Sequence, residues 1–413
     1  MRQNIKYMNP ENRQRIREQA VHVLLALFVG PAVGALDALF GRVLLFLSAV
    51  REAHVYLLLP FLPLAGLLIT FLYYHYSRLS LKGMTLLFET GQKKREEIPG
   101  PLIPLVMVGT WITHLFGGSA GREGVAVQLG GTVSHTIGRK LHMPDQGRIM
   151  LVTGMAAGFA GLFRTPLTAA FFAIEVITAG VLDYEALLPA LIASYLASLT
   201  SAALGLEKFS VILTDAYVPG FADAWKLPVL GIAFGLAGWL FSYCLALSKR
   251  FMSTRISDPY RRIGFVSVPL FILLMLSAGR YSGLGTNLIR LSFTGGQVYA
   301  WDWILKFFFT ILTLSIGFQG GEVTPLFSIG ASLGAILGML LGMPPMLTAA
   351  LGYAAVFGSA TNTLLAPVLI GLEVFGAQNM LLFVIVCAVA YILNGNCSIY
   401  AAQEVFSRKD PAD

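Results

Sequence analysis

The sequence has 413 residues, of which 56% are hydrophobic and only 12% are charged. Soluble domains carry about 25% charged residues, so this composition excludes an ordinary soluble enzyme. The formal net charge of +7 does not indicate a nucleic-acid partner, because much of the positive charge flanks apolar segments. We therefore expect an all-α integral membrane protein whose surroundings are the lipid bilayer.

Residues 1–19 are polar and basic, and they precede the first apolar segment. An excess of Lys and Arg marks the cytoplasmic side of a membrane protein, so we expect a cytoplasmic N-terminus. We expect no cleaved signal peptide, because no apolar core leading to a small-residue cleavage site follows. Instead, the segment is expected to form a short helix against the membrane. The basic residues that carry this expectation are Arg2, Lys6, Arg13, Arg15 and Arg17.

The apolar segments differ in length, and a helix needs about 20 residues to cross bilayer hydrocarbon. Residues 102–111 and 304–318 are short for a crossing, which predicts broken or half-spanning helices around a cavity. We assign residues 20–403 to one transmembrane domain and residues 404–413 to a cytoplasmic tail. The longer apolar segments in chain order are 20–50, 54–74, 227–247 and 380–393.

Cysteine and histidine show no pattern of a metal site. The cysteines, Cys244, Cys387 and Cys397, lie in or beside apolar segments and fit no metal spacing or disulfide framework. The six histidines are scattered, without an H-E-x-x-H pattern. We therefore expect no metal and no cofactor.

The second half of the sequence repeats features of the first. Shifting the sequence by 198 positions aligns residues 154–176 with residues 352–374 without gaps, and eight of the 23 positions are identical. Two related halves are typical of duplicated transporter folds. We assign about residues 20–205 to the first repeat and about 225–403 to the second.

The most unusual polar residue is Glu123, in the glycine-rich segment 118–125. A carboxylate at membrane depth is costly unless it is paired, hydrated or protonated, and it marks an ion or proton pathway by default. The alternative is a structural carboxylate paired with Arg122. Glu322 occupies the same place in the second repeat, at an offset of 199. Its alternative role is to stabilise a helix dipole from the helix N-terminus.

Both glycine-rich segments are expected to open a helix, and Pro325 fits the first turn of the second one. A helix N-terminus presents unpaired N–H groups and about half a positive charge, and glycine lets the backbone approach a bound ion. Two such helix starts meeting at a pseudo-twofold axis would bind an anion without a full positive charge. An ionised glutamate would occupy this site itself and a protonated one would leave it, which couples the anion to a proton.

At these residues the sequence resembles the CLC family of anion channels and anion/proton antiporters. Residues 118–130 are similar to the G-R-E-G-P signature with its surroundings, and residues 166–175 to the P-L-x-G…E-E helix. Residues 398–401 resemble the helix start that carries the central anion-coordinating tyrosine, here Tyr400. The resemblance covers essentially the whole membrane domain. It implies a CLC-type homodimer with one pathway per subunit, built of two inverted repeats with many tilted and broken helices.

Three departures from the family pattern resemble its fluoride/proton antiporter branch. Met84 takes the place of the chloride-coordinating serine, and Glu322 adds a carboxylate to the second loop. The inner proton-relay glutamate of chloride antiporters would fall on Val176. The short C-terminal tail, without a regulatory domain, is expected of a bacterial member.

The resemblance and the residue chemistry together define a candidate transport site. We expect Glu123 and Glu322 to gate transport and couple it to protons. Backbone N–H groups at the helix starts and two hydroxyl groups are expected to bind the anion, since fluoride is a strong hydrogen-bond acceptor. The candidate anion-binding residues are Met84, Gly121, Arg122, Gly124, Val323, Thr324 and Tyr400.

Several of these residues have structural alternatives. Met84 could serve packing alone, the Thr324 hydroxyl could serve its own helix start, and Tyr400 could be an interfacial anchor. Glu175 and Glu373 match across the repeat, so we interpret them as structural partners of backbone groups.

We therefore expect a fluoride/proton antiporter of the bacterial inner membrane, which exports fluoride in exchange for inward protons and confers fluoride resistance. It would be a secondary active transporter rather than an enzyme. The main alternatives are a chloride/proton antiporter or chloride channel of the same fold, and a proton-coupled carrier for another anion. Residues 117–121 also match G-x-S-x-G, which raises a membrane hydrolase using Ser119. That motif needs a preceding strand and partner His and Asp residues.

Overall fold

The computed structural model describes residues 10–406 except 144, 146 and 214. Expectations for residues 1–9 and 407–413, which include Arg2, Lys6 and most of the expected tail, lie outside the described residues. Most of the described chain is helical, and its two strands have two residues each. This confirms the expected all-α architecture.

The elements of the first half, in chain order, are α1 (Pro10–Ala53), α2 (Val55–Leu58), η2 (Leu59–Phe61), α3 (Leu62–Tyr76), η3 (Arg78–Lys82), α4 (Met84–Gly91), α5 (Leu102–Leu115), α6 (Glu123–Lys140), α7 (Arg148–Phe163), α8 (Pro166–Val176), β1 (Thr178–Ala179) and α9 (Tyr184–Ala203). Those that follow are η4 (Phe221–Asp223), α10 (Lys226–Arg255), α11 (Pro259–Leu276), α12 (Thr286–Phe293), α13 (Asp302–Ile316), α14 (Val323–Leu341), α15 (Pro345–Thr361), α16 (Leu365–Phe375), η5 (Ala377–Asn379), α17 (Met380–Ile392) and β2 (Glu404–Val405). The two strands pair in parallel.

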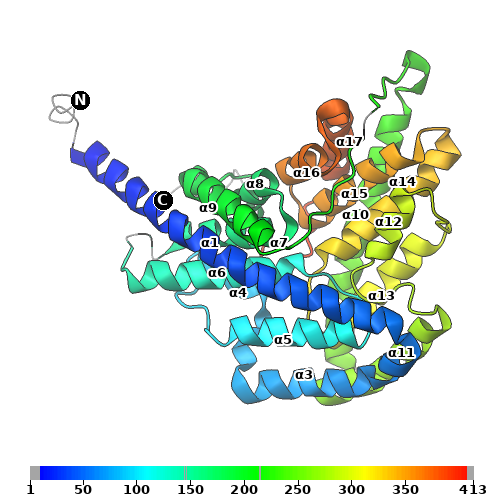
Figure 1. The fold of residues 1–413 in the computed structure, drawn as a ribbon, viewed down its shortest axis with the longest axis horizontal. Helices are drawn as coiled ribbons and strands as arrows, with labels where there is room; N and C mark the ends of the chain where they lie inside the picture. Colours follow the sequence, from blue (N-terminus) through cyan, green and yellow to red (C-terminus); the bar gives the residue numbers. More distant parts are fainter. Residues whose placement is uncertain (1–9, 144, 146, 214, 407–413) are drawn as a thin grey trace.

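The first helix is longer than the sequence indicated. α1 continues without a break through residue 19, so residues 10–19 extend the first apolar helix and do not form a separate surface helix. Figure 1 shows its N-terminal end projecting beyond the other helices. Gly30 and Gly34 face α9, where a Cβ would lie 2.7 Å from Ala193 O and 2.4 Å from Ala197 O, respectively. This four-residue glycine spacing lets the two backbones approach closely.

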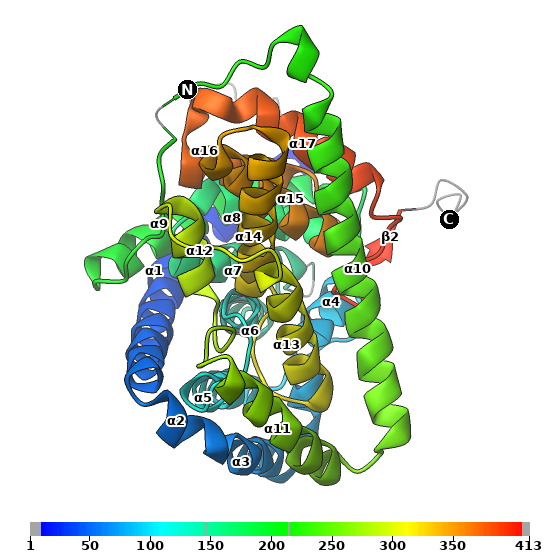
Figure 2. The same ribbon diagram turned by 90° about the vertical axis from the view of Figure 1, so that its right-hand side faces the viewer.

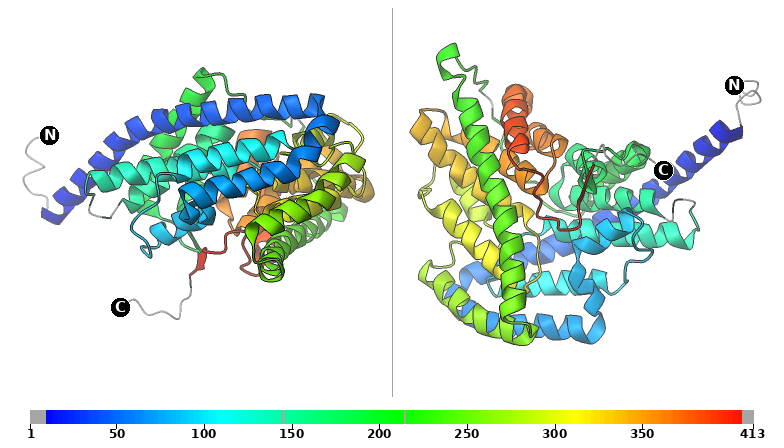
Figure 3. Two further views of the ribbon diagram at one scale, coloured as in Figure 1. Left: turned by 90° about the horizontal axis from the view of Figure 1, so that it is seen from below. Right: turned by 180° about the vertical axis from the view of Figure 1, so that it is seen from behind.

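The chain has both full-length and short apolar helices. Helices long and apolar enough to cross a membrane include Tyr184–Ala203, Pro259–Leu276 and Val323–Leu341. Others, such as α5 and α16, have only 14 and 11 residues. Figure 3 shows the long α10 crossing one side of the molecule, and Figure 2 shows α6 end-on near the middle. The short helices agree with the expected broken helices around an interior site.

The two repeats are visible as matching runs of helices. The helices α5 to α8 have 14, 18, 16 and 11 residues, and α13 to α16 have 15, 19, 17 and 11. α6 and α7 touch backbone to backbone, because a Cβ on Gly154 would lie 2.2 Å from Gly130 O. In the second repeat, a Cβ on Gly352 would lie 2.2 Å from Gly330 O. The two halves therefore use the same glycine contact.

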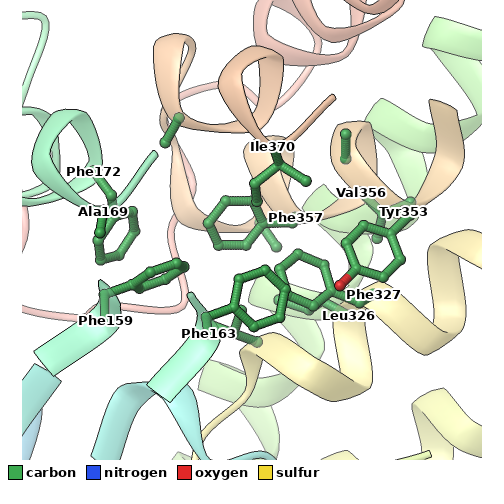
Figure 4. Packing of buried hydrophobic residues seen from close by; sticks show 14 of the residues in the cluster. Phe159, Phe163, Ala169, Phe172, Leu326, Phe327, Tyr353, Val356, Phe357 and Ile370 are labelled. Carbon is green, nitrogen blue, oxygen red and sulfur yellow. The ribbon is translucent and has the colours of Figure 1, made fainter. Parts of the chain in front are cut away.

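The core lies where the two halves meet. Aromatic rings from α7 and α8 pack against rings from α14 and α15 (Figure 4). Phe163 stacks on Phe327 with ring centroids 5.2 Å apart, and Phe172 lies 5.9 Å from Phe357. Phe327 also stacks on Tyr353 at 4.0 Å. These contacts bury large apolar surfaces between the repeats and hold the neighbouring helix starts in place.

Two carboxylates complete this junction by capping helices of the opposite repeat. Glu373, near the end of α16, accepts hydrogen bonds from Leu167 N at 3.0 Å and Thr168 N at 2.7 Å, at the start of α8. Glu175, near the end of α8, accepts from Leu364 N at 2.6 Å and from the next two N–H groups, at the start of α16. Because helix starts leave N–H groups unpaired, these contacts confirm the interpretation of both residues as partners of backbone groups.

Candidate functional site

The two glycine-rich loops meet in the interior of the molecule. Gly121 N donates to Gly321 O at 2.5 Å, and Gly321 N donates to Gly121 O at 2.8 Å, forming an antiparallel bridge. α6 begins two residues after Gly121, and α14 begins two residues after Gly321. The bridge thus brings two helix N-termini together at the junction of the repeats, as predicted. The predicted pairing of Glu322 with Glu123 is wrong by one residue, because Glu322 is the N-cap of α14 and matches Arg122, the N-cap of α6.

Glu123 is enclosed at this junction and is only 1% exposed. Its Oε2 accepts hydrogen bonds from Thr324 N at 3.1 Å, from the Thr324 hydroxyl and from Arg122 N at 3.3 Å. The carboxylate of the first repeat therefore occupies the helix start of the second. That is where an anion would bind, because the N–H groups and the helix dipole point there.

The alternative of a simple ion pair with Arg122 has little support in the geometry. Arg122 Nε lies 3.9 Å from Glu123 Oε1, and no hydrogen bond joins the two groups among the described residues. Arg122 side-chain atoms Nε and Nη1 also have no hydrogen-bond partner in that part of the chain. The helix start of α14, rather than the guanidinium group, holds the Glu123 carboxylate.

Glu322 lies on the other side of the bridge and faces a cavity of about 430 Å³. It is the N-cap residue of α14, but its side chain does not cap the helix. Its Oε1 lies 3.6 Å from Lys249 Nζ, near the end of α10. Because Lys249 is exposed and also lines the cavity, the cavity reaches the surface on this side.

A third helix start reaches the same cavity. α4 begins at Met84, directly after Gly83, whose φ of +51° favours glycine. Met84, Gly124 and Tyr400 all line the cavity. Tyr400 is buried, with its ring 5.1 Å from that of Phe88. One prediction about this segment is wrong: Tyr400 lies in an irregular stretch after α17 and not at a helix start.

The structure divides the candidate residues into two groups. Glu123, Val323 and Thr324 are enclosed around the bridge, and none of these three lines the cavity. The cavity side holds Met84, Gly124, Glu322 and Tyr400. Their roles in transport stay predictions.

Sequence reasoning missed several polar residues of the cavity, Lys249 and Gln128 among them, and one polar residue of the interior. Lys249 and Gln128 both line the cavity, and Lys306 is fully buried on α13. A signal for Lys306 was present, since it is a lysine within an apolar helix. Lys249 carries no comparable signal, because it lies near the exposed end of α10, and Gln128 carries only a weak one, because its side chain is uncharged.

The context required for a hydrolase is absent around Ser119 in the described chain. A helix, α5, precedes the G-x-S-x-G segment, where the motif needs a strand. The nearby ring of His114 contacts Thr110 O and Ala120 O instead of the Ser119 hydroxyl. The described residues also include no group of three or more His, Cys, Asp or Glu side chains that could hold a metal.

Comparison with known proteins places this fold in a family. The profile of the voltage-gated chloride channel family, Voltage_CLC, matches residues 65–395. The chain belongs to the CLC family. A chloride/fluoride channel protein of Pseudomonas syringae pv. tomato is 34% identical to this CLC chain, over 97% of the chain and 90% of the relative.

Solved structures agree with this assignment. The crystal structure of a CLC-type fluoride/proton antiporter is 52% identical, with a TM-score of 0.92, and the match covers 94% of this chain and 98% of the other. A slow cyanobacterial Cl⁻/H⁺ antiporter matches over 92% and 96% of the two chains at 20% identity and a TM-score of 0.77, which supports the fold alone. The CLC chain is thus a multi-pass membrane protein with the CLC fold.

Proposed function

We propose that this CLC protein is a fluoride/proton antiporter that exports fluoride from the cytoplasm in exchange for inward protons. The observation that carries the proposal is the Glu123 carboxylate bound to the helix start of α14 through Thr324. A carboxylate that fills a site built for an anion competes with that anion, and a proton ends the competition. The 52% identity to a CLC-type fluoride/proton antiporter supports fluoride as the anion.

Protonation of Glu123 removes the charge that the helix start of α14 attracts. The neutral side chain then leaves, and fluoride takes its place against Thr324 N–H and the Thr324 hydroxyl. When fluoride leaves, Glu123 returns only after losing its proton, so each exchange moves the two ions in opposite senses. Glu322, on the cavity side of the same bridge, is placed to exchange protons and anions with the cavity.

Selectivity for fluoride over chloride calls for short, strong hydrogen-bond donors. Fluoride is smaller and more strongly hydrated than chloride, and its shell must be replaced by protein groups. The Thr324 N–H and hydroxyl groups, the start of α4 at Met84 and the Tyr400 hydroxyl offer such donors. Met84 also stands where the resemblance expects a chloride-coordinating serine, so its side chain offers chloride no hydroxyl donor.

The cavity is proposed to open to the cytoplasm. Exposed or part-exposed cations gather around it, at Lys249 and Arg262, and positive loops mark the cytoplasmic side. Lys94 Nζ lies 2.6 Å from Glu404 Oε1, which brings a further basic loop to the segment that follows Tyr400. We also propose a cytoplasmic N-terminus, insertion in the bacterial inner membrane and a homodimer with one pathway per subunit.

Proteoliposomes loaded with fluoride or chloride test the proposal when anion and pH are recorded together. We expect fluoride efflux with proton uptake and little chloride efflux. Glu123→Gln should abolish proton-coupled exchange, because the amide cannot carry the proton. Glu97→Gln is the control, since the Glu97 side chain is 71% exposed and pairs with Arg139, at the opposite end of α6 from Glu123. Proton-coupled exchange that persists in Glu123→Gln would refute the role assigned to Glu123.

The relative from Pseudomonas syringae is named as a chloride/fluoride channel protein, which favours a channel as the second candidate. A channel would release anions down their gradient without moving protons. The same recording separates the two, because anion efflux without a pH change identifies a channel. Equal chloride and fluoride efflux with proton uptake would instead identify a chloride/proton antiporter.

A further inference from the structure

Lys306 is a fully buried lysine on α13 that the proposed exchange cycle does not use. Lysine is almost never fully buried unless it is paired, so its position requires an explanation. Its Nζ donates hydrogen bonds to Gly283 O at 2.7 Å, Ser119 Oγ at 2.8 Å and Tyr281 O at 3.2 Å. Three donated bonds match the three protons of an ammonium group, so Lys306 has no free lone pair to act as a base.

The acceptors of Lys306 belong to the loop that carries Glu123 and to the segment that supports it. Ser119 lies four residues before Glu123. Gly283 O, which accepts from Lys306, also accepts from Ala120 N at 3.2 Å, and Gly283 N donates to Gly118 O at 3.0 Å. The ammonium group thus joins two chain segments that are already hydrogen-bonded to each other.

Other side chains of α13 hold the same loop. Ser119 N donates to Thr313 Oγ1 at 3.2 Å, and Ser119 Oγ lies 2.9 Å from Thr310 Oγ1. The lysine stem passes next to Gly285, where a Cβ would lie 2.7 Å from Lys306 Cε. One face of α13, a helix of the other repeat, therefore holds the loop before Glu123.

The repeat does not reproduce this arrangement. The bridge pairs Gly121 with Gly321, and this offset of 200 relates Lys306 to Val106 on α5. Valine has no donor that could bind the second loop in the same way. The hydrogen bonds from Lys306 to the first loop are therefore particular to that loop and are not a consequence of the duplicated fold.

We propose that Lys306 is a positioning residue that fixes the loop before Glu123, so that proton uptake moves the Glu123 side chain and not its loop. The inference rests on the proposed antiport function. Without the hydrogen bonds from Lys306, the Glu123 carboxylate would no longer return reliably to Thr324. Fluoride would then pass without an exchanged proton. Lys306 therefore sets how tightly the two fluxes are coupled.

The test compares the ratio of proton to fluoride flux in proteoliposomes for Lys306→Met, Lys306→Arg and Ser119→Ala. Lys306→Met keeps the apolar stem and should lower the ratio by about twofold or more, since small misplacements of a reacting group have large effects. Lys306→Arg keeps a cation with several donors and should restore part of the ratio. Ser119→Ala removes one acceptor and should lower the ratio less than Lys306→Met.

Ser292→Ala is the matched control, because it removes a buried hydroxyl whose hydrogen bond in the described chain goes to Leu288 O, within α12. A wild-type ratio in Lys306→Met overturns the inference, as does Lys306→Arg behaving like Lys306→Met. If Lys306→Met is not monodisperse, Ser119→Ala decides, and an unchanged ratio there overturns the inference. A wild-type protein without coupled exchange would refute the proposed function instead, which keeps the two failures distinct.

Discussion

Thr324→Val removes one of the groups that hold Glu123 at the start of α14. Its hydroxyl and its backbone N–H both donate to Glu123 Oε2, with Arg122 N as the third donor. Valine has a similar shape and keeps the N–H, so the loss is confined to one hydrogen bond. A hydrogen bond to a charged group contributes about 1.5–3 kcal/mol.

That energy sets the expected size of the effect. A loss of 1.4 kcal/mol is a factor of ten in an equilibrium. The population in which Glu123 binds Thr324 should therefore fall about 10- to 150-fold relative to the population in which Glu123 has left Thr324. Fluoride should then reach the helix start more often without protonation of Glu123. We expect fewer protons moved per fluoride, together with a weaker affinity for fluoride, because fluoride loses the same hydroxyl donor.

The assay is paired fluoride and proton recording from proteoliposomes of wild type, Thr324→Val and Thr324→Ser. Serine keeps the hydroxyl and loses only a methyl group, so Thr324→Ser should stay close to wild type in its flux ratio. If Thr324→Val exchanges both ions at the wild-type ratio, the hydrogen bond from the Thr324 hydroxyl does not control the position of Glu123, and the reasoning is refuted.

Glu322→Ala should leave fluoride flux but move fewer protons per fluoride; an unchanged ratio in paired recording would count against a coupling role. Glu373→Gln should destabilise the protein by about 1.5–3 kcal/mol, because the amide can accept from only one of the two N–H groups at the start of α8. Thermal unfolding in detergent checks this, and an unshifted transition would contradict it. Gly154→Ala places a Cβ 2.2 Å from Gly130 O and should lower the same transition clearly. Gly100→Ala, with open space around it, should not.

Features that depend on local pattern could be predicted from the sequence. The glycine-rich segments open helices because glycine and the following residues fit a helix start, and the structure has α6 and α14 there. The equal places of Glu175 and Glu373 in the repeat predicted that they bind backbone groups, but not that each caps a helix of the opposite repeat. Short apolar segments predicted helices that end inside the molecule, as α5 does.

Features that depend on long-range packing could not be predicted. Nothing local indicates that Glu123 crosses to Thr324, because the contact joins residues 201 positions apart. The irregular stretch at Tyr400 is held by tertiary contacts, such as Ile399 N donating to Ala360 O at 2.9 Å, which override its resemblance to a helix start. The acceptors of Lys306 are likewise hidden in sequence, because they come from two separate loops.

The exchanged carboxylates at Glu175 and Glu373 also bear on how the protein is made. During synthesis the first half emerges with the start of α8 lacking its partner, because Glu373 lies 206 residues beyond Leu167. Until residue 373 has been made, Leu167 N and Thr168 N lack this acceptor. The start of α16 differs, because its acceptor Glu175 is made before it. Synthesis from the N-terminus therefore supplies the cap of α16 in advance and the cap of α8 only afterwards.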